Sequence, residues 1–243
     1  MKISVVIPVR DDAAMLAECL AALAGQSRAP DEVVVVDNGS YDDSGEVARR
    51  FGARVVYEPE RGIWAAAATG FDAASGDLLA RCDADSRPGV DWIERLERAM
   101  AANPAAVAVT GPGRFYDLAL PWRLLADLLY MRAYFWSTHG ALANTPLFGS
   151  DFAIRASTWR QVRGEVHRHD PEVHDDLDLS YHLDPAWTVL YDRRIAVGIS
   201  ARPLRDAAGM RRRVRRAVHT IRIHGAEGRP TPRWRRRILG RSQ

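Results

Sequence analysis

Short apolar runs rich in β-branched residues alternate with helix-like segments through the first half of the chain. The clearest run is Val33–Val36, and similar runs lie at Ile3–Ile7 and Leu78–Cys82. A continuous run of this kind is typical of a strand that is covered on both faces, as in parallel sheets. Parallel neighbours need a crossover of a dozen or more residues, which is usually helical. The pattern therefore predicts an α/β, Rossmann-like fold with a mostly parallel sheet and helices on both faces.

The same criteria place the other elements. Further strands are expected at Arg54–Tyr57, Ala106–Thr110, Trp187–Tyr191 and Ile195–Ile199, with a loop and then a strand over Phe148–Ile154. Helices are expected around Met15–Leu23, over Ser44–Phe51, Trp64–Ala74 and Trp92–Ala101, and from Asp175 onward. An amphipathic helix is expected over Pro121–Trp136, packed on the core or lying on a membrane surface, because three charged residues interrupt it.

Polar residues follow three of the expected strands, at Pro8–Asp12, Asp37–Ser40 and Asp83–Asp85. In open α/β sheets, ligands bind beyond the carboxyl ends of the strands. Mg²⁺ and Mn²⁺ prefer oxygen ligands, and Mg²⁺ usually takes one or two carboxylates together with phosphates. The pair Asp83 and Asp85 therefore predicts a site for a metal and a diphosphate.

The net charge of +3 conceals a strongly basic end of the chain. From Arg202 onward the sequence has 14 arginines, opposed only by Asp206 and Glu227, whereas residues 1–201 are net acidic. We expect a basic helical extension over 202–243, with one or two helices broken at Pro230 and Pro232. Such a segment suits anionic lipid headgroups, nucleic acid or phosphorylated substrates.

Other features bear on where the protein works. No apolar run approaches the roughly 20 residues that span a bilayer. The apolar run at the start is short and ends in Pro8, which favours a first strand over a signal peptide. Cys19 and Cys82 lie in segments expected to be buried and have no metal-binding spacing, which favours a reducing, cytoplasmic compartment.

Three segments in order, Ile3–Asp11, Glu32–Ser40 and Gly76–Asp85, resemble a family 2 glycosyltransferase with the GT-A fold. Gly149-Ser150-Asp151 and Asp175–Leu179 match later, acceptor-side motifs of that family. The resemblance implies a GT-A domain over residues 1–201. Its nucleotide-binding half would be 1–115 and its acceptor-side half 116–201.

The resemblance also implies inverting, metal-dependent transfer of a sugar from a nucleotide-diphosphate sugar, with a UDP-sugar favoured. The acceptor would be a hydroxyl of a lipid-linked or envelope glycan or of a small glycoside. A nonprocessive, hexosyltransferase-type enzyme is expected, because the transmembrane helices and Gln-x-x-Arg-Trp motif of processive members are not found. Separately from the resemblance, the arginines of the basic extension would attach the enzyme to the inner face of the membrane.

Residue roles follow from the same resemblance. Asp37 would contact the base, with Pro8, Arg10 and Asp12 around base and ribose. Asp83 would lie near ribose and metal, and Asp85 would ligate Mn²⁺ or Mg²⁺. Gly149, Ser150 and Asp151 would face the acceptor. Asp176 would deprotonate the acceptor hydroxyl, and Asp175 stands where the family more often has Glu.

The chain departs from the family at two places. Ala66–Thr69 lacks the Arg and Asn of the family's Ala-Arg-Asn, so Arg61 or Arg81 would have to substitute. The stretch Gly198–Arg202 lacks a metal-binding histidine. Either Arg202 meets the diphosphate directly, or His219 or His224 folds back to the metal.

Several residues keep a second interpretation. Asp37 could begin an Asx-turn, and Asp176 could cap a helix, leaving Asp175 or Asp178 as the base. Trp64 could stack on a sugar, although core packing is favoured. His167, His169 and His174 flank an acidic loop, where solvated histidines are favoured over metal ligands.

The sequence disfavours two other functions, nucleotidyl transfer and nucleic-acid binding. A nucleotidyltransferase would need a Gly-rich, basic loop after the first strand, which Pro8–Asp12 does not supply. Nucleic-acid binding through the extension is disfavoured, because Trp234 is its only aromatic residue and residues 1–201 are acidic.

Overall fold

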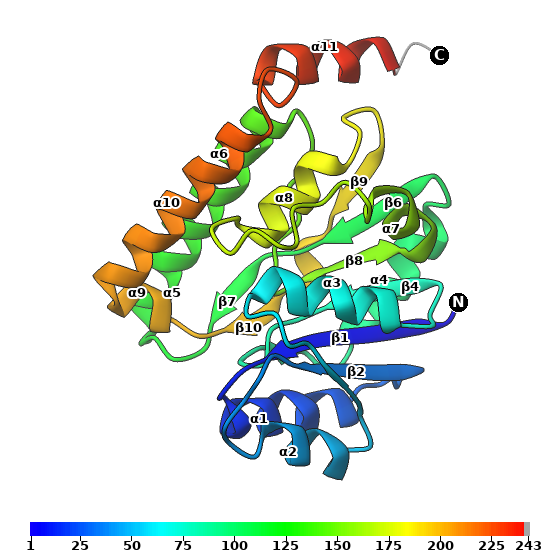
Figure 1. The fold of residues 1–243 in the computed structure, drawn as a ribbon, viewed down its shortest axis with the longest axis vertical. Helices are drawn as coiled ribbons and strands as arrows, with labels where there is room; N and C mark the ends of the chain where they lie inside the picture. Colours follow the sequence, from blue (N-terminus) through cyan, green and yellow to red (C-terminus); the bar gives the residue numbers. More distant parts are fainter. Residues whose placement is uncertain (241–243) are drawn as a thin grey trace.

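The computed structural model describes residues 1–240, and its centre is a mostly parallel sheet (Figure 1). Within these residues the sheet has the strand order β3-β2-β1-β4-β8-β6-β9. Its strands are β1 (Ile3–Val9), β2 (Glu32–Asp37), β3 (Arg54–Tyr57), β4 (Leu78–Arg81), β6 (Ala106–Thr110), β8 (Phe152–Arg155) and β9 (Thr188–Tyr191). All neighbours are parallel except β8, which runs antiparallel to β4 and β6. The predicted sheet is thus confirmed.

Helices cover both faces of this sheet, as predicted (Figure 1). On one face lie α1 (Ala13–Ala24), α2 (Ser44–Arg50) and α4 (Trp92–Ala102), whose buried side chains form one core cluster with β1 and β4. On the other face lie α3 (Ile63–Ala73), α7 (Ala156–Val162) and α8 (Asp175–His182), which form a second cluster. Only α7 among these helices has no counterpart in the sequence prediction.

A small second sheet lies beside the first. It consists of β5 (Arg87–Pro88), β10 (Val197–Ile199) and β7 (Gly113–Phe115), in that order. Strands of two or three residues carry no usable periodicity, so β5 and β7 were not predicted from the sequence. The expected strand at Ile195–Ile199 is shorter than predicted, because a 3₁₀ turn, Arg193–Ile195, precedes it.

The predicted amphipathic helix is present and longer than expected. It comprises α5 (Leu120–Ala126), a π-helical turn at Asp127–Met131 and α6 (Arg132–Leu142). Met131 packs into a third apolar cluster with Phe115, Phe148 and Ile199. Other large apolar side chains of this segment remain exposed: Leu120, Trp122, Leu124, Leu125, Leu128, Leu129 and Trp136.

The C-terminal segment is helical, with α9 (Arg202–Arg205), α10 (Ala207–Ile223) and α11 (Pro230–Gly240). Pro230 and Pro232 lie in the first turn of α11, where proline is tolerated, so they begin a helix instead of breaking one. Arg233 anchors α11: its buried guanidinium donates to the backbone oxygens of Leu142, Tyr181 and Leu183. Arg241, counted in the basic extension, lies outside the described residues.

Helix α10 runs along the outside of the molecule, next to α8 (Figure 1). Thr220 faces inward and its hydroxyl accepts a hydrogen bond from the backbone N–H of His174. Val214, Val218 and Ile221, whose spacing is that of an apolar helix face, are exposed together with the arginines around them. None of the helices among residues 1–240 is long and apolar enough to cross a membrane.

Candidate active site

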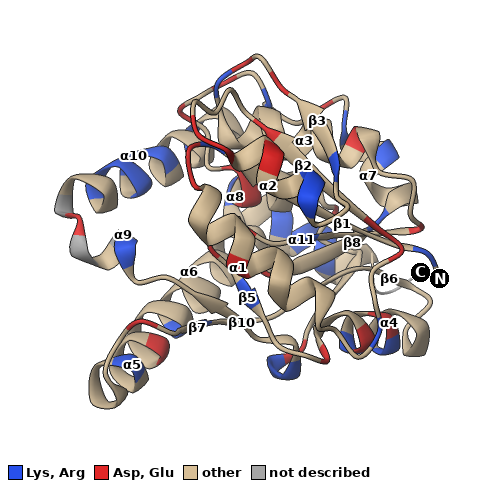
Figure 2. Ribbon diagram, turned by 90° about the horizontal axis from the view of Figure 1, so that it is seen from below, with Lys and Arg blue, Asp and Glu red and all other residues tan. Residues whose placement is uncertain are grey.

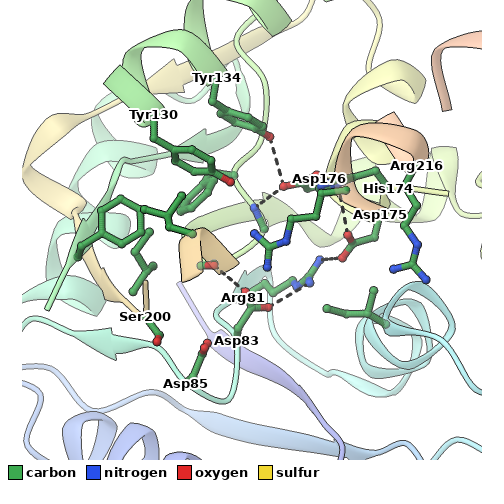
Figure 3. A pocket seen from close by; sticks show the side chains of 18 of the residues that line it. Arg81, Asp83, Asp85, Tyr130, Tyr134, His174, Asp175, Asp176, Ser200 and Arg216 are labelled. Atoms are coloured by element: carbon green, nitrogen blue, oxygen red, sulfur yellow. Dashed lines mark hydrogen bonds and ion pairs between the residues drawn. The ribbon is translucent and has the colours of Figure 1, made fainter. Parts of the chain in front are cut away.

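Two cavities that share lining residues lie beyond the carboxyl ends of β1 and β4. The β1 cavity, about 470 Å³, is lined by Pro8, Val9, Arg10, Asp12, Asn38, Arg61, Gly62, Ile63, Ala66, Asp83, Ala84, Asp85, Pro171, Arg202, Arg213 and Arg216. The α8 cavity, about 220 Å³, lies between α8, α10 and the π-helical segment, and includes Tyr130, Tyr134, Gly149, Ser150, His174, Asp175 and Asp176 (Figure 3). Asp83 and Asp85 line both cavities, so these carboxylates stand where the two meet.

The tight turn after β4 presents Asp83 and Asp85. Ser86 closes it, since its backbone N–H donates to Asp83 O and its Oγ accepts from the Asp83 backbone N–H. Burial raises the pKa of Asp85, and the neighbouring carboxylate of Asp83 adds to that rise. Mg²⁺ and Mn²⁺ prefer carboxylate oxygens as ligands, and a bound cation would offset the repulsion between these two carboxylates. The residues present therefore fit such an ion.

Arg202 supplies the positive charge at this carboxylate group. One of its nitrogens, Nη2, lies 2.7 Å from Asp12 Oδ2 and 2.8 Å from Asp85 Oδ2. Both carboxylates raise the pKa of the guanidinium. Of the sequence alternatives for this position, the structure brings Arg202 to Asp85. His219 instead pairs with Asp170 at 2.7 Å, and His224 lies beside Asp178.

The β1 cavity contains most of the residues expected around the nucleotide, namely Pro8, Arg10, Asp12, Asp83 and Arg202. Asp37 does not line it. The Asp37 carboxylate accepts a hydrogen bond from Ser40 N at 2.9 Å, which is the turn-forming alternative. Asn38 lines the cavity instead, and its side chain bonds the backbone of Glu58, Glu60 and Gly62.

The loop from Glu58 to Gly62 also brings the guanidinium of Arg61 to the β1 cavity. Arg61 lines the cavity and donates a hydrogen bond to the hydroxyl of Tyr41. Arg81, the other substitute considered from the sequence, lies on the α8 cavity instead. Of the two substitutes, Arg61 is therefore the one that lines the β1 cavity.

Arg81 links the turn after β4 to the start of α8. Its side chain is buried, with Nη1 2.5 Å from Asp175 Oδ2 and Nη2 3.2 Å from Asp83 Oδ1 (Figure 3). Burial alone would lower the pKa of Arg81, but Asp175, Asp83 and Asp176 together raise it above its usual value. One buried guanidinium therefore compensates carboxylates on both sides of the site.

Three groups contact the Asp176 carboxylate at the wall of the α8 cavity. Its Oδ2 accepts hydrogen bonds from Gly149 N at 2.8 Å and from the Tyr134 hydroxyl at 3.2 Å (Figure 3). Its Oδ1 lies 2.6 Å from His174 Nδ1. Although burial opposes ionisation, His174, the Gly149 N–H and Arg81 lower the pKa of Asp176 to about 2. The carboxylate is therefore ionised at neutral pH and fixed in one orientation.

The acceptor-side motif divides between the cavity and the core. Gly149 and Ser150 line the α8 cavity, and Ser150 Oγ donates to Asp83 Oδ2 at 2.6 Å. Asp151 is fully buried, accepts a hydrogen bond from Trp92 Nε1 and has a pKa that burial raises well above its usual value. The structure does not bring Asp151 to the cavity, because its side chain points into the core against α4.

Three residues that the sequence left with two interpretations, Asp178, Trp64 and His169, line neither the α8 cavity nor the β1 cavity. Asp178, a fallback base, is fully buried and faces Trp64, His167, His182 and His224 rather than either cavity. Trp64 is buried against Trp159, as core packing requires. His169 is exposed and pairs with Glu60.

Four residues at the site were missed by sequence reasoning: Tyr130, Tyr134, Arg213 and Arg216. The arginines belong to the basic segment, whose charge was the only signal available. The tyrosines lie on the amphipathic segment, and no pattern distinguished them from its apolar residues. Together these residues give the α8 cavity one aromatic wall and one cationic wall.

The sequence is similar to known glycosyltransferases. The profile described as Glycosyl transferase family 2 matches residues 4–166. The glycosyltransferase AglE of Haloferax volcanii is 38% identical over 101 residues, which are 38% of this chain and 33% of AglE. The glycosyltransferase GlyA of Streptococcus pneumoniae is 30% identical over 143 residues, 55% of this chain and 20% of GlyA. The chain thus matches a third or less of the length of these two relatives.

Solved structures confirm the predicted GT-A fold. The mannosyltransferase PcManGT from Pyrobaculum calidifontis, in complex with GDP-Man and Mn²⁺, superposes with a TM-score of 0.73 at 20% identity. The alignment covers 99% of this chain and 69% of that one. Glucosyl-3-phosphoglycerate synthase from Mycobacterium tuberculosis, with Mn²⁺, UDP and glucosyl-3-phosphoglycerate, gives 0.59 at 22% identity, covering 90% and 78%.

Proposed function

The chain belongs to glycosyl transferase family 2, and we propose that it transfers a sugar, with inversion, from a nucleotide-diphosphate sugar to an acceptor hydroxyl. One observation carries the proposal: two cavities meet at Asp83 and Asp85, and the second has the ionised carboxylate of Asp176 on its wall. A donor in the β1 cavity would present its anomeric carbon to an acceptor in the α8 cavity. Residues 1–115 would then form the donor half, and residues 116–201 most of the acceptor half.

In the donor half, Pro8, Arg10 and Asp12 would contact base and ribose, and Asp37 would act by fixing the turn that brings Asn38 to the cavity. Asp83 and Asp85 would hold Mn²⁺ or Mg²⁺. When bound, that ion neutralises charge on the departing diphosphate. Arg202 is within reach of the same anion if it releases Asp85. We favour a UDP-sugar as donor.

In the acceptor half, Asp176 would take the proton of the acceptor hydroxyl. With a pKa of about 2 it is a weak base, so the proton would move as the new C–O bond forms and the hydroxyl becomes acidic. The hydrogen bonds from Gly149 and Tyr134 would keep its lone pairs in a fixed direction. Asp175 is a poorer candidate, because its carboxylate is tied to Arg81.

The acceptor would be a lipid-linked or envelope glycan reached at the cytoplasmic surface of a membrane. The segment that carries the exposed apolar residues and the helix that carries the arginines both contribute to the α8 cavity, the first through Tyr130 and Tyr134 and the second through Arg213 and Arg216. In both views α5, α9 and α10 project on one side of the molecule, and basic residues colour much of α10 in Figure 2. Apolar side chains with arginines nearby are typical of proteins that bind the surface of an anionic membrane.

A donor screen tests the proposal directly. The purified chain is incubated with UDP-, GDP-, dTDP- and CDP-sugars and Mn²⁺, and nucleotide release is measured with and without a chelator. We expect one nucleotide to raise the melting temperature and its sugar to be consumed, both only with the metal. If no nucleotide stabilises the protein under any metal condition, the proposal is refuted.

A further inference from the structure

Three of the seven histidines of the chain gather around one buried carboxylate, away from both cavities. They are His167 in the loop after α7, His182 on the last turn of α8 and His224 at the end of α10. Their ring centroids lie 5.0–5.5 Å apart. The carboxylate belongs to Asp178, which is fully buried. Segments far apart in sequence thus converge on one point.

All three rings direct a nitrogen at the same oxygen. Asp178 Oδ1 lies 2.8 Å from His167 Nδ1, 3.3 Å from His224 Nε2 and 3.5 Å from His182 Nε2. The other oxygen, Oδ2, is already occupied, because it accepts hydrogen bonds from Trp64 Nε1 and the backbone N–H of His167. The two hydrogen bonds to Oδ2 therefore fix the orientation of the carboxylate and direct Oδ1 toward the histidines.

The tautomer of His224 places a nitrogen lone pair next to the negatively charged Oδ1, which is unfavourable. Its Nδ1 lies 2.8 Å from the backbone oxygen of Thr220, which can only accept, so Nδ1 must carry a proton. In the neutral ring, Nε2 then points a lone pair at the anionic Oδ1. Among the described residues, neither this Nε2 nor that of His182 has a hydrogen-bond partner, and both are buried.

A divalent cation removes this unfavourable contact, because it accepts the Nε2 lone pair of His224 and can accept one from each of the other two rings in the matching tautomer. Protonating His224 instead would place a cationic imidazolium in a buried position, with its ring centroid 5.0 Å from that of His182. In a tetrahedral zinc site with Zn–N bonds near 2.05 Å, neighbouring ligand atoms are about 3.4 Å apart. The observed separations from Oδ1, 2.8–3.5 Å, bracket that value.

The surroundings resemble those of a structural metal site. Ligating histidines usually donate their second N–H to a carbonyl or carboxylate. His224 does so to Thr220, and His182 has its Nδ1 3.7 Å from Glu165 Oε2. Three imidazoles and one carboxylate suit Zn²⁺, whereas Asp83 and Asp85 offer only oxygen. The two sites would therefore select different ions.

We propose that His167, Asp178, His182 and His224 bind a structural Zn²⁺ ion that fastens α10 to α8. The first turn of α8 carries Asp175 and Asp176, so the ion would hold α10 against the element that presents these carboxylates. The proposal stands independently of sugar transfer, since zinc content and thermal stability do not require turnover.

The test is zinc content and stability of the full chain, prepared without a polyhistidine tag. We expect the metal-free protein to take up one equivalent of Zn²⁺, to melt higher with Zn²⁺ than with a chelator, and to show the visible absorption of tetrahedral Co²⁺ when cobalt replaces zinc. Absence of stoichiometric uptake by the wild-type chain overturns the proposal, whatever the variants do.

Variants then locate the ion. His224→Gln removes a ligand and should weaken Zn²⁺ binding at least tenfold. His219→Gln is its matched control, because His219 lies on the same helix and pairs with Asp170 outside the cluster. Asp85→Ala should keep full zinc uptake. Loss of zinc in His219→Gln or Asp85→Ala, or its retention at wild-type affinity in His224→Gln, would put the ion elsewhere and refute the assignment.

Discussion

Arg81 and Asp175 form a buried ion pair, with 2.5 Å between Nη1 and Oδ2. The same guanidinium reaches Asp83, so the turn after β4 and the start of α8 are held together by one side chain. The separation between the proposed metal ligands and the proposed base is therefore set by a rigid contact and not by loops.

Removing Arg81 should be costly. Arg81→Met leaves Asp175 buried without its partner, which typically destabilises a protein by about 3–5 kcal/mol. Urea denaturation measures the change. The double variant Arg81→Met, Asp175→Asn removes the uncompensated charge and should recover part of the loss. If both variants unfold at the same urea concentration, the pair does not couple the two segments.

The metal assignment predicts a selective binding defect. Asp85→Ala should abolish Mn²⁺-dependent nucleotide binding and leave the fold intact, because Asp85 lies at the surface of the cavity and not in the core. Calorimetric titration with UDP, with and without Mn²⁺, measures it. Asp91→Ala is the control, since it removes a carboxylate that pairs with Arg95 on α4 and lines neither cavity. Unchanged Mn²⁺-dependent binding by Asp85→Ala contradicts the assignment.

The base assignment predicts a defect in turnover alone. Asp176→Asn keeps the shape, and its oxygen can still accept from Gly149, but it cannot take a proton. Donor affinity should persist while turnover falls by about 100-fold or more. Single-turnover kinetics and donor titration separate the two effects. Near-normal turnover would transfer the role to Asp175, the neighbouring carboxylate on α8 that also lines the α8 cavity.

The anchor of α11 is open to a simple test. Arg233→Met leaves three backbone oxygens without their charged donor and should destabilise the docking of α11 by on the order of 3 kcal/mol. Limited proteolysis should then cleave the segment before α11 faster. Arg235→Met, on the same helix but exposed, serves as the control. Equal cleavage rates for the two variants would show that Arg233 is not the anchor.

Membrane attachment predicts binding to anionic vesicles that weakens with salt. Polybasic segments gain about 1 kcal/mol per charge near such a surface. Replacing both Arg211 and Arg212 with Gln should therefore weaken vesicle binding roughly 30-fold. The control replaces Arg49 and Arg50, exposed on α2, with Gln. Sedimentation with anionic and neutral liposomes at low salt measures both, and a full-length protein that ignores anionic vesicles refutes attachment.

Local pattern explains which parts of the fold could be predicted. The runs at Val33–Val36 and Leu78–Cys82 became β2 and β4 because covered strands need continuous apolar sequence. Helix α7 and the short strands β5 and β7 were missed, since their partners, and not their own periodicity, stabilise them. The antiparallel entry of β8 between β4 and β6 is likewise a matter of tertiary pairing.

The sequence by itself determined the alternation of strands and helices and the positions of the acidic turns, because both depend on neighbouring residues. Only the tertiary structure decided which of these side chains meet. It turned Asp151 into the core, gave Asp176 its partners from Gly149 and Tyr134, and brought His167 and His224 from other segments to Asp178 beside His182. Such contacts depend on how whole helices and strands pack. A short-range sequence pattern does not encode contacts between residues far apart in the chain.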